Sequence, residues 1–229
     1  MIVMVPETTA IDCGSTVEVT SVSQLRDLVG EPLPRTANKV RARLEPVHRE
    51  WLAASPFCLL ATAGGDGRCD VSPKGDPPGF VRVLDDRTVV VPDRKGNKRL
   101  DGLGNILANP HVGLVHLIPH VTRGEFTSSD GRGDTLRVNG RARIVSEAPF
   151  FDAMTVAGRR PQLAIVVDVE EVFFHCAKAF LRSKLWDADS WRPDTVASRA
   201  VIEHELERPG DDLADLERYY GRQYAQDLY

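Results

Sequence analysis

The sequence contains no long apolar run and few aromatic residues. None of its apolar runs approaches the ~20 residues that a membrane-spanning helix needs, so a membrane protein is not expected. The first residues, Met1–Pro6, include no basic residue and do not open a signal-peptide pattern, which makes a cytoplasmic protein the simplest expectation. Aromatic residues make up 7% of the chain. Apolar residues at 42% and charged residues at 27% are ordinary for a globular protein of 229 residues.

Cysteine and histidine spacing argues against a disulfide framework and against a metal site. The four cysteines are far apart and form no C-x-x-C pair: Cys13, Cys58, Cys69 and Cys176. Cys58 falls within an apolar run and is expected to be buried. His111, His116 and His120 do not share one strand spacing, so no joint metal site is predicted.

Charge and periodicity divide the chain into three regions. Residues 1–20 show little periodicity and are predicted to be a flexible arm, and residues 21–191 are predicted to form the main domain. From Trp191 onward there are nine acidic and five basic residues, which accounts for the net charge of −4 and leaves 24 of each in the rest. Residues 192–229 are predicted to be a helical extension whose four tyrosines could pack against a neighbouring subunit. A neutral body with an acidic extension gives no reason to expect nucleic-acid binding.

Apolar runs separated by turn residues predict a mainly antiparallel β structure. The runs expected to be strands cover residues 56–63, 68–73, 80–84, 87–91, 112–118, 134–146 and 163–174. Helices are predicted for residues 21–28, 39–54 and 101–109, with Ser21 as a cap and either a kink or a split at Pro46. Many antiparallel strands around one helix predict an α+β fold with a closed or partly closed barrel. A Gly/Ser/Thr-rich loop, 119–134, is either a lid or disordered.

A cationic turn lies between a predicted strand and a predicted helix. Four basic residues fall within six positions around Gly96: Arg94, Lys95, Lys98 and Arg99. A strand end that leads through such a turn into a helix start is a good seat for an anion. The helix offers free N–H groups, and arginine can bind phosphate oxygens with two hydrogen bonds. A solvated basic turn would have the same composition, so the neighbouring motifs decide between the two interpretations.

Four motifs occur in order around this turn: Asp70-Val-Ser-Pro-Lys-Gly-Asp-Pro-Pro-Gly-Phe80, Asp93-Arg-Lys-Gly-Asn-Lys-Arg99, Asn105-Ile-Leu-Ala-Asn-Pro110 and Leu136-Arg-Val-Asn-Gly-Arg-Ala142. Together they resemble the pyridoxamine 5′-phosphate oxidase-like flavoproteins of the split β-barrel type. Phe173–Lys178 and Arg182–Trp186 resemble a bacterial FMN-dependent branch of that family. The resemblance covers Pro56 to Trp191. It implies a split β-barrel with flanking helices, FMN as cofactor, and a homodimer with the flavin at its interface.

The resemblance assigns the cationic turn to the phosphate and ribityl chain of the cofactor. The ligands that it implies are Lys98 and Arg99 first, then Arg94 and Asn97, within the segment that begins at Asp93. Lys95 is expected to face solvent. Arg82 lies where relatives place a cofactor-contacting arginine, and a surface pair with Asp85 or Asp86 is the competing explanation.

The resemblance places the strand that begins at Asp70 beside the isoalloxazine ring. Ser72 and Lys74 would then reach ring N5 or the C2 carbonyl, where hydrogen bonds or positive charge favour the anionic reduced ring. Arg137 and Asn139 share one face of a predicted strand, and that face is either directed at the cofactor or exposed to solvent. Three further residues are implied to close the site from the partner subunit: Lys178, Arg182 and Trp186.

The leading functional hypothesis is an FMN-dependent oxidoreductase that transfers hydride or electrons to or from a small molecule, with NAD(P)H as a candidate electron donor. The sequence identifies no catalytic acid–base constellation, which fits a protein that only positions a flavin. One alternative is a non-catalytic flavin or haem binding or storage protein. Another is a deazaflavin (F420)-dependent reductase on the same fold. Oxidation of vitamin B6 itself is not expected, because no second phosphate site is evident.

Overall fold

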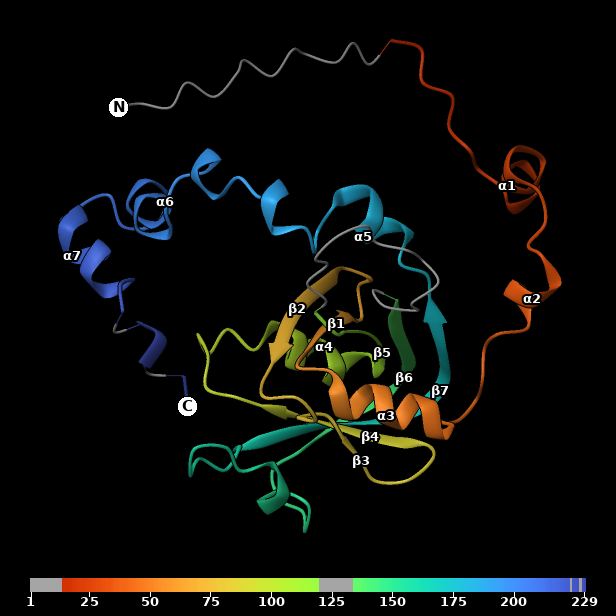
Figure 1. Ribbon diagram of the computed structural model, residues 1–229, viewed down its shortest axis with the longest axis horizontal. Coiled ribbons are helices and arrows are strands. Elements are labelled where there is room, and N and C mark those ends of the chain that lie inside the picture. Colours follow the sequence, from red (N-terminus) through yellow and green to blue (C-terminus); the bar gives the residue numbers. More distant parts are fainter. Residues whose placement is uncertain (1–13, 120–133, 223, 227) are drawn as a thin grey trace. The chain divides into compact units, whose positions relative to one another are not determined.

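The computed structural model describes residues 14–119, 134–222, 224–226 and 228–229 (Figure 1). Nearly all of the predicted loop 119–134 and most of the predicted arm 1–20 lie outside the described residues. The chain divides into two units. The larger, here called the barrel unit, contains residues 40–191 and 222–229, and the second contains residues 1–39 and 192–221.

One seven-stranded antiparallel sheet forms the barrel unit. Its strands are β1 (Phe57–Ala63), β2 (Cys69–Gly75), β3 (Arg82–Val83), β4 (Thr88–Asp93), β5 (His111–Leu117), β6 (Thr135–Val145) and β7 (Leu163–His175). Their spatial order is β2-β1-β5-β6-β7-β4-β3, so β2 and β3 are the edges of the sheet. The sheet curls around α4 (Asp101–Ala108), which packs against β1, β2 and β6 (Figure 1). This is a split β-barrel with flanking helices, and every predicted strand is present within two residues of its expected ends.

Strand β4 is buried on both faces, which explains its uninterrupted apolar sequence. Val89 and Val91 point into the main core, together with Ile165 and Val167 of β7 and with Leu103 and Ile106 of α4. Val90 points the other way, into a smaller cluster with Phe151 and Met154. The segment after β6, which includes η2 (Asp152–Met154), therefore covers the second face of β4 and β7.

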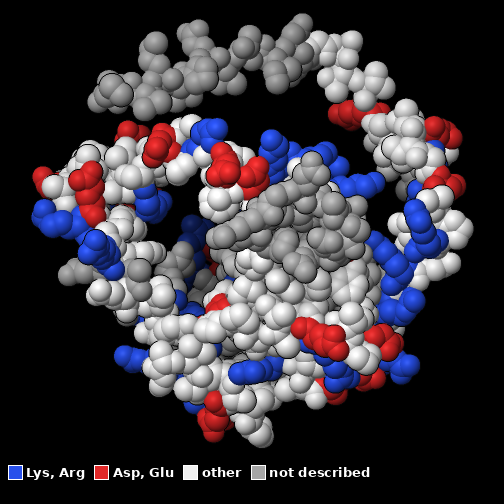
Figure 2. All heavy atoms as spheres, in the orientation of Figure 1, with Lys and Arg blue, Asp and Glu red and all other residues white. Residues whose placement is uncertain are grey.

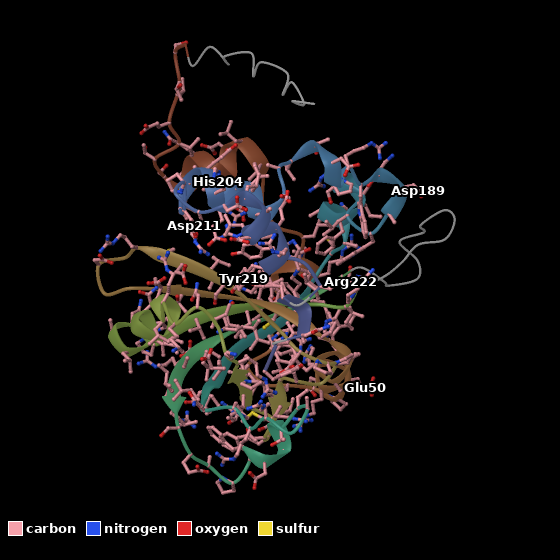
Figure 3. All side chains as sticks on the ribbon, turned by 90° about the vertical axis from the view of Figure 1, so that its left-hand side faces the viewer. Glu50, Asp189, His204, Asp211, Tyr219 and Arg222 are labelled. Carbon is pink, nitrogen blue, oxygen red and sulfur yellow. The ribbon has the colours of Figure 1, made fainter. Side chains whose placement is uncertain are left out.

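The predicted helix 39–54 is wrong in its first half. Helix α3 covers only Pro46–Ala54, and Pro46 occupies its first turn. Proline is favoured there because its missing N–H would have no intrahelical acceptor and its φ is already helical. The helix starts at a reciprocal capping box, in which the backbone N–H of Glu45 donates to His48 Nδ1 at 3.0 Å. Glu50, on the outer side of α3, projects into solvent (Figure 3).

The barrel unit continues after β7 through α5 (Lys178–Ser183) and η3 (Ala188–Ser190), and it also includes η5 (Tyr224–Gln226). The second unit contains α1 (Val22–Val29), α2 (Pro34–Ala37), η4 (Pro193–Thr195), α6 (Arg199–Leu206) and α7 (Leu213–Tyr219). Helix α1 begins as predicted, because the Ser21 side chain accepts the N–H of Gln24 at 3.2 Å. It ends at Gly30, whose φ of 77° favours glycine.

Figure 2 shows Lys and Arg side chains interspersed with Asp and Glu over the viewed face. Within the described parts of the chain, no helix is both long enough and apolar enough to cross a bilayer.

Candidate functional site

A cavity of about 1230 Å³ opens on the barrel unit between β2, the turn from β4 into α4, and the start of β7. Its wall is rich in positive charge, with seven basic and three acidic side chains in a protein whose net charge is −4. The basic residues are Lys74, Arg94, Lys95, Lys98, Arg99, Arg159 and Arg160, and the acidic residues are Asp70, Asp93 and Asp101. This concentration of positive charge favours an anionic ligand.

The start of α4 lies in the wall of this cavity. The residue before the helix, Leu100, has a φ of 63° and supplies no side-chain cap, so the first helical N–H groups are not capped by it. Lys98 also has a positive φ, of 62°. Two non-glycine residues in this unfavourable region mark a turn whose shape is held by its surroundings. Uncapped N–H groups at the positive end of a helix can bind an anion.

Arg99 is the more exposed of the two arginines in this turn. Its side chain is 74% exposed, and its Nε donates to Asp101 Oδ2 at 2.7 Å. Its backbone N–H donates to Asn97 Oδ1 at 3.1 Å, so Asn97 shapes the turn with its side chain. The pairing with Asp101 raises the pKa of Arg99, which keeps the guanidinium charged.

Residues 70–74 of β2 line the cavity, and alternate residues among them share the more buried face of the strand. Asp70, Ser72 and Lys74 are half-buried, and all three are part of the cavity wall. Lys74 donates to Asp93 Oδ1 at 2.8 Å in a largely buried ion pair, with side chains 21% and 19% exposed. The edge strand is thereby tied to the end of β4, so both walls of the cavity are held together by this pair.

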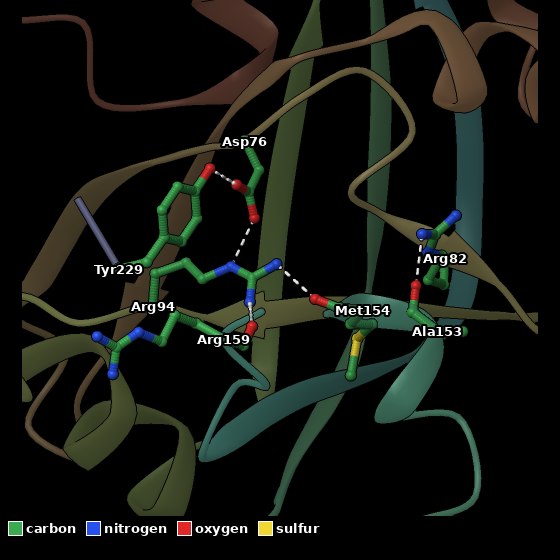
Figure 4. Close-up of polar contacts among 7 residues, drawn as sticks. All are labelled: Asp76, Arg82, Arg94, Ala153, Met154, Arg159 and Tyr229. Carbon is green, nitrogen blue, oxygen red and sulfur yellow. Dashed lines mark hydrogen bonds and ion pairs between the residues drawn. The ribbon is translucent and has the colours of Figure 1, made fainter. Parts of the chain in front are cut away.

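Arg94 is held by protein partners on every side (Figure 4). Its Nε donates to Asp76 Oδ2 at 2.5 Å, and the Asp76 side chain is only 1% exposed. Its terminal nitrogens donate to the backbone carbonyls of Met154 at 2.7 Å and Arg159 at 3.5 Å. These contacts indicate a structural role that fixes the end of β4, and they leave the predicted phosphate contact of Arg94 without support.

The structure separates Arg82, Arg137 and Asn139 from the residues that line the cavity. Arg82 is exposed and donates to the carbonyl of Ala153 at 2.5 Å (Figure 4), a partner that the sequence did not suggest. Arg137 and Asn139 lie on the outer face of β6, as their alternation with buried Val138 predicted. The Arg137 guanidinium lies 5.0 Å from the Phe173 ring, and Asn139 donates to Glu171 at 2.8 Å.

Beside these two residues, the outer face of β1, β2 and β5 carries apolar side chains. In strand β1 only Cys58, Leu60 and Thr62 are buried, and the alternate residues are half-exposed. The outward side chains that pair across β1, β2 and β5 include Leu59, Pro73 and Val115, with Val71 at 58% exposed beside them. A contiguous, partly exposed apolar face of this kind is typical of an interaction surface.

The third group of predicted residues lies on and after α5. Lys178 and Arg182 are exposed. Trp186 is half-buried, and its ring centroid lies 5.5 Å from that of Phe180 in the same subunit. Its indole N–H is buried and has no hydrogen-bond partner within the described part of the chain. A buried N–H without an acceptor is uncommon in folded proteins.

Two titratable side chains are buried away from the cavity. Cys58 and His116 are cross-strand partners on β1 and β5, and both are 0% exposed. Burial raises the pKa of the Cys58 thiol to about 12 and lowers the pKa of His116 to about 3, so both are neutral. Neither ring nitrogen of His116 has a hydrogen-bond partner among the described residues. No three His, Cys, Asp or Glu side chains of the described residues converge on a position for a metal.

Sequence reasoning missed three residues of this site: Asp76, Arg159 and Tyr229. Asp76 lies inside the first motif, but nothing in the motif shows that its carboxylate is buried. Arg159 reaches the cavity from the loop before β7, where only its charge gives a signal. Tyr229 was named only among the tyrosines that could pack against a neighbouring subunit, and its hydroxyl donates to Asp76 Oδ1 at 2.6 Å in its own chain (Figure 4).

The sequence model of the family described as pyridoxamine 5′-phosphate oxidase matches residues 44–176, which is more than half of the chain. The chain belongs to the pyridoxamine 5′-phosphate oxidase family. The match includes the cationic turn, α4 and every strand of the split barrel. The cavity of this chain therefore lies largely within the part that defines the family.

No curated protein matches the chain. Solved structures that resemble it include a putative pyridoxamine 5′-phosphate oxidase from Lactobacillus delbrueckii, 21% identical with a TM-score of 0.41, over 59% of this chain and 98% of that one. An FMN-binding protein from Syntrophomonas wolfei is 13% identical with a TM-score of 0.38, over 55% and 86%. The haem storage protein HutZ from Vibrio cholerae is 15% identical with a TM-score of 0.37, over 58% and 94%.

Proposed function

We propose that this protein is an FMN-dependent oxidoreductase that binds its flavin in the cationic cavity and works as a homodimer. The observation that carries the proposal is the meeting of a cationic turn and an uncapped helix start in one cavity wall. A phosphate dianion needs several fixed donors, and this wall offers them in one place. Lys98, Arg99 and the first N–H groups of α4 are the proposed phosphate ligands. Asn97 and Arg94 shape the turn that presents them.

The rest of the cavity suits the remainder of the cofactor. Its volume of about 1230 Å³ exceeds the range typical of drug-sized ligands, so a nucleotide-sized molecule has room. Ser72 and Lys74 are proposed to face the polar edge of the ring, and Asp70 and Asp93 the ribityl hydroxyls. When bound, the flavin supplies the hydride or electron chemistry. The residues of this chain bind it, orient it and hold a positive charge at Lys74.

The donor set of the cavity argues against haem. Haem iron is usually held by histidine, cysteine, methionine or tyrosine. No histidine, cysteine or methionine is found among the described residues of the cavity wall, and the hydroxyl of the one tyrosine donates to Asp76. A deazaflavin (F420) also carries phosphate, so the same seat could hold it. Storage without turnover would need the same contacts. Reduction by NAD(P)H followed by substrate turnover separates an enzyme from a storage protein.

The proposed homodimer is supported by the apolar outer face of β1, β2 and β5. A surface that exposes Val71 at 58% beside half-buried Leu59 and Val115 is better covered than left in water. Arg137 and Asn139 lie on the outer sheet face, so they can reach a flavin only in a neighbouring subunit. Lys178, Arg182 and Trp186 are proposed to reach the partner's flavin in the same way.

Paired arginine and lysine variants test the phosphate seat. Arg99→Ala should weaken FMN binding about 10- to 150-fold, which corresponds to the ~1.5–3 kcal/mol of a hydrogen bond to a charged group. Lys95→Ala is the comparison: Lys95 belongs to the same turn and cavity wall but is expected to face solvent, so its loss should change the affinity by less than about threefold. Both affinities are measured by quenching of flavin fluorescence. Equal affinities for the two variants would remove Arg99 from the phosphate seat.

A further inference from the structure

Tyr229 is part of the cavity wall although it is far in sequence from its partners. Its hydroxyl donates to Asp76 Oδ1 at 2.6 Å, and the Arg94 guanidinium carbon lies 5.6 Å from the centre of its ring (Figure 4). Its segment, 222–229, belongs to the barrel unit, whereas residues 192–221 belong to the second unit. The chain therefore returns to the barrel unit and places an aromatic ring at the cavity.

The burial of Asp76 explains why Tyr229 is held in one place. The Asp76 side chain is 1% exposed, so its two carboxylate oxygens must take their hydrogen bonds from the protein. Arg94 Nε donates to one oxygen and the Tyr229 hydroxyl to the other. Loss of either donor would leave a buried carboxylate oxygen unsatisfied, which is unfavourable. The hydrogen bond to Asp76 also raises the pKa of Tyr229, which keeps the phenol protonated as a donor.

The position of this contact along β2 indicates which part of a ligand the ring would meet. Asp76 follows Lys74 by two residues, immediately beyond the end of β2. The β2 side of the cavity, with Ser72 and Lys74, is the side proposed above for the polar edge of the flavin ring, and the phosphate seat lies at α4. A tyrosine ring whose hydroxyl is already bonded loses little freedom when it contacts a flat ligand, which favours binding.

We infer that Tyr229 is a ligand-contacting residue of the cavity, whose ring forms a preassembled aromatic wall for the flat ring system of the bound cofactor. Asp76 and Arg94 are the positioning residues that hold this wall. The inference rests on the proposed function for the identity of the ligand. The preassembly of the wall does not depend on that identity, because the contacts among Tyr229, Asp76 and Arg94 need no ligand.

Three variants of the full chain separate the ring from its hydroxyl. Tyr229→Ala removes both, Tyr229→Phe keeps the ring and removes the hydrogen bond to Asp76, and Tyr224→Ala is the control. Tyr224 is on the same segment, is 54% exposed and is not among the residues that line the cavity. In an FMN titration, the dissociation constant should rise about tenfold for Tyr229→Ala and about threefold for Tyr229→Phe. It should stay within about twofold for Tyr224→Ala.

Hydrogen exchange of the ligand-free proteins tests the wall without any cofactor. Residues 93–102 should exchange faster in Tyr229→Ala than in wild type, whereas β6 should be unchanged, which also shows that the variant is folded. Unchanged exchange in 93–102 overturns the inference. Equal FMN affinities in all variants, with a wild type that binds FMN, remove Tyr229 from the site and leave the FMN proposal standing. If wild type binds no FMN, but residues 93–102 still exchange faster in Tyr229→Ala than in wild type, the FMN proposal is refuted and the preassembled aromatic wall is retained.

Discussion

Replacing His116 with leucine should make the protein more resistant to acid. His116 is 0% exposed, and burial lowers its pKa to about 3 from an ordinary value of 6.5. Between these two pH values the unfolded chain binds a proton at this position and the folded chain does not. The free energy of unfolding therefore falls as the pH drops from 6.5 towards 3. Above pH 6.5 His116 is neutral in both states, and this loss of stability is absent. The full difference corresponds to an upper limit of about 5 kcal/mol.

Urea unfolding of wild type and His116→Leu at pH 7.5 and pH 4.5 measures this contribution. At pH 4.5, two units below the ordinary pKa, wild type should have lost about 2–3 kcal/mol more than the variant. At pH 7.5 the variant should be at least as stable as wild type, because leucine fills a similar volume and removes two ring nitrogens that have no described partner. His175→Gln, at an exposed position, is the control. Identical pH dependence in wild type and His116→Leu would refute the account of a buried, unpaired imidazole.

Two further variants test the supports of the site. Asp76→Ala should lower the free energy of unfolding by about 3 kcal/mol, because it leaves the Arg94 guanidinium, 15% exposed, without its carboxylate partner. Urea unfolding measures this change. A loss below about 1 kcal/mol would contradict a buried ion pair between Asp76 and Arg94. Trp186→Ala should reduce the gain in dimer affinity that FMN brings, because the buried indole N–H has no acceptor among the described residues and is proposed to contact the partner subunit. Sedimentation with and without FMN measures this gain. A variant that melts at a lower temperature but dimerises and binds FMN as wild type does would show that Trp186 only stabilises its own subunit.

The strands were predictable because their apolar runs and turn residues reflect local burial. Glycine and aspartate mark the β1–β2 turn, and the run Thr88–Val91 is apolar because both of its faces are covered. The helix 39–54 was predicted too long because the apolar spacing continues upstream of Pro46, whereas the backbone does not remain helical there. The spacing of apolar side chains indicates which face of a helix is buried, but the proline determines where the helix begins.

The candidate site was predictable where its residues are neighbours in sequence. Lys98, Arg99 and the start of α4 form one continuous segment, and the alternation of Ser72 and Lys74 along β2 predicts that they share a face. The role of Arg94 was not predictable, because its partner Asp76 is buried by tertiary packing that no local pattern encodes. Tyr229 was missed for the same reason, since its contact joins residues 153 positions apart.

Identification of the cofactor tests the central claim most directly. Full-length protein is purified without added flavin, its absorption spectrum is recorded, and the small molecules released on denaturation are identified by mass spectrometry. The account predicts a flavin band near ~450 nm and release of FMN, and it predicts that stripped protein binds FMN again. A Soret band near ~400 nm with release of haem, release of a deazaflavin, or a stripped protein that does not bind FMN would contradict it.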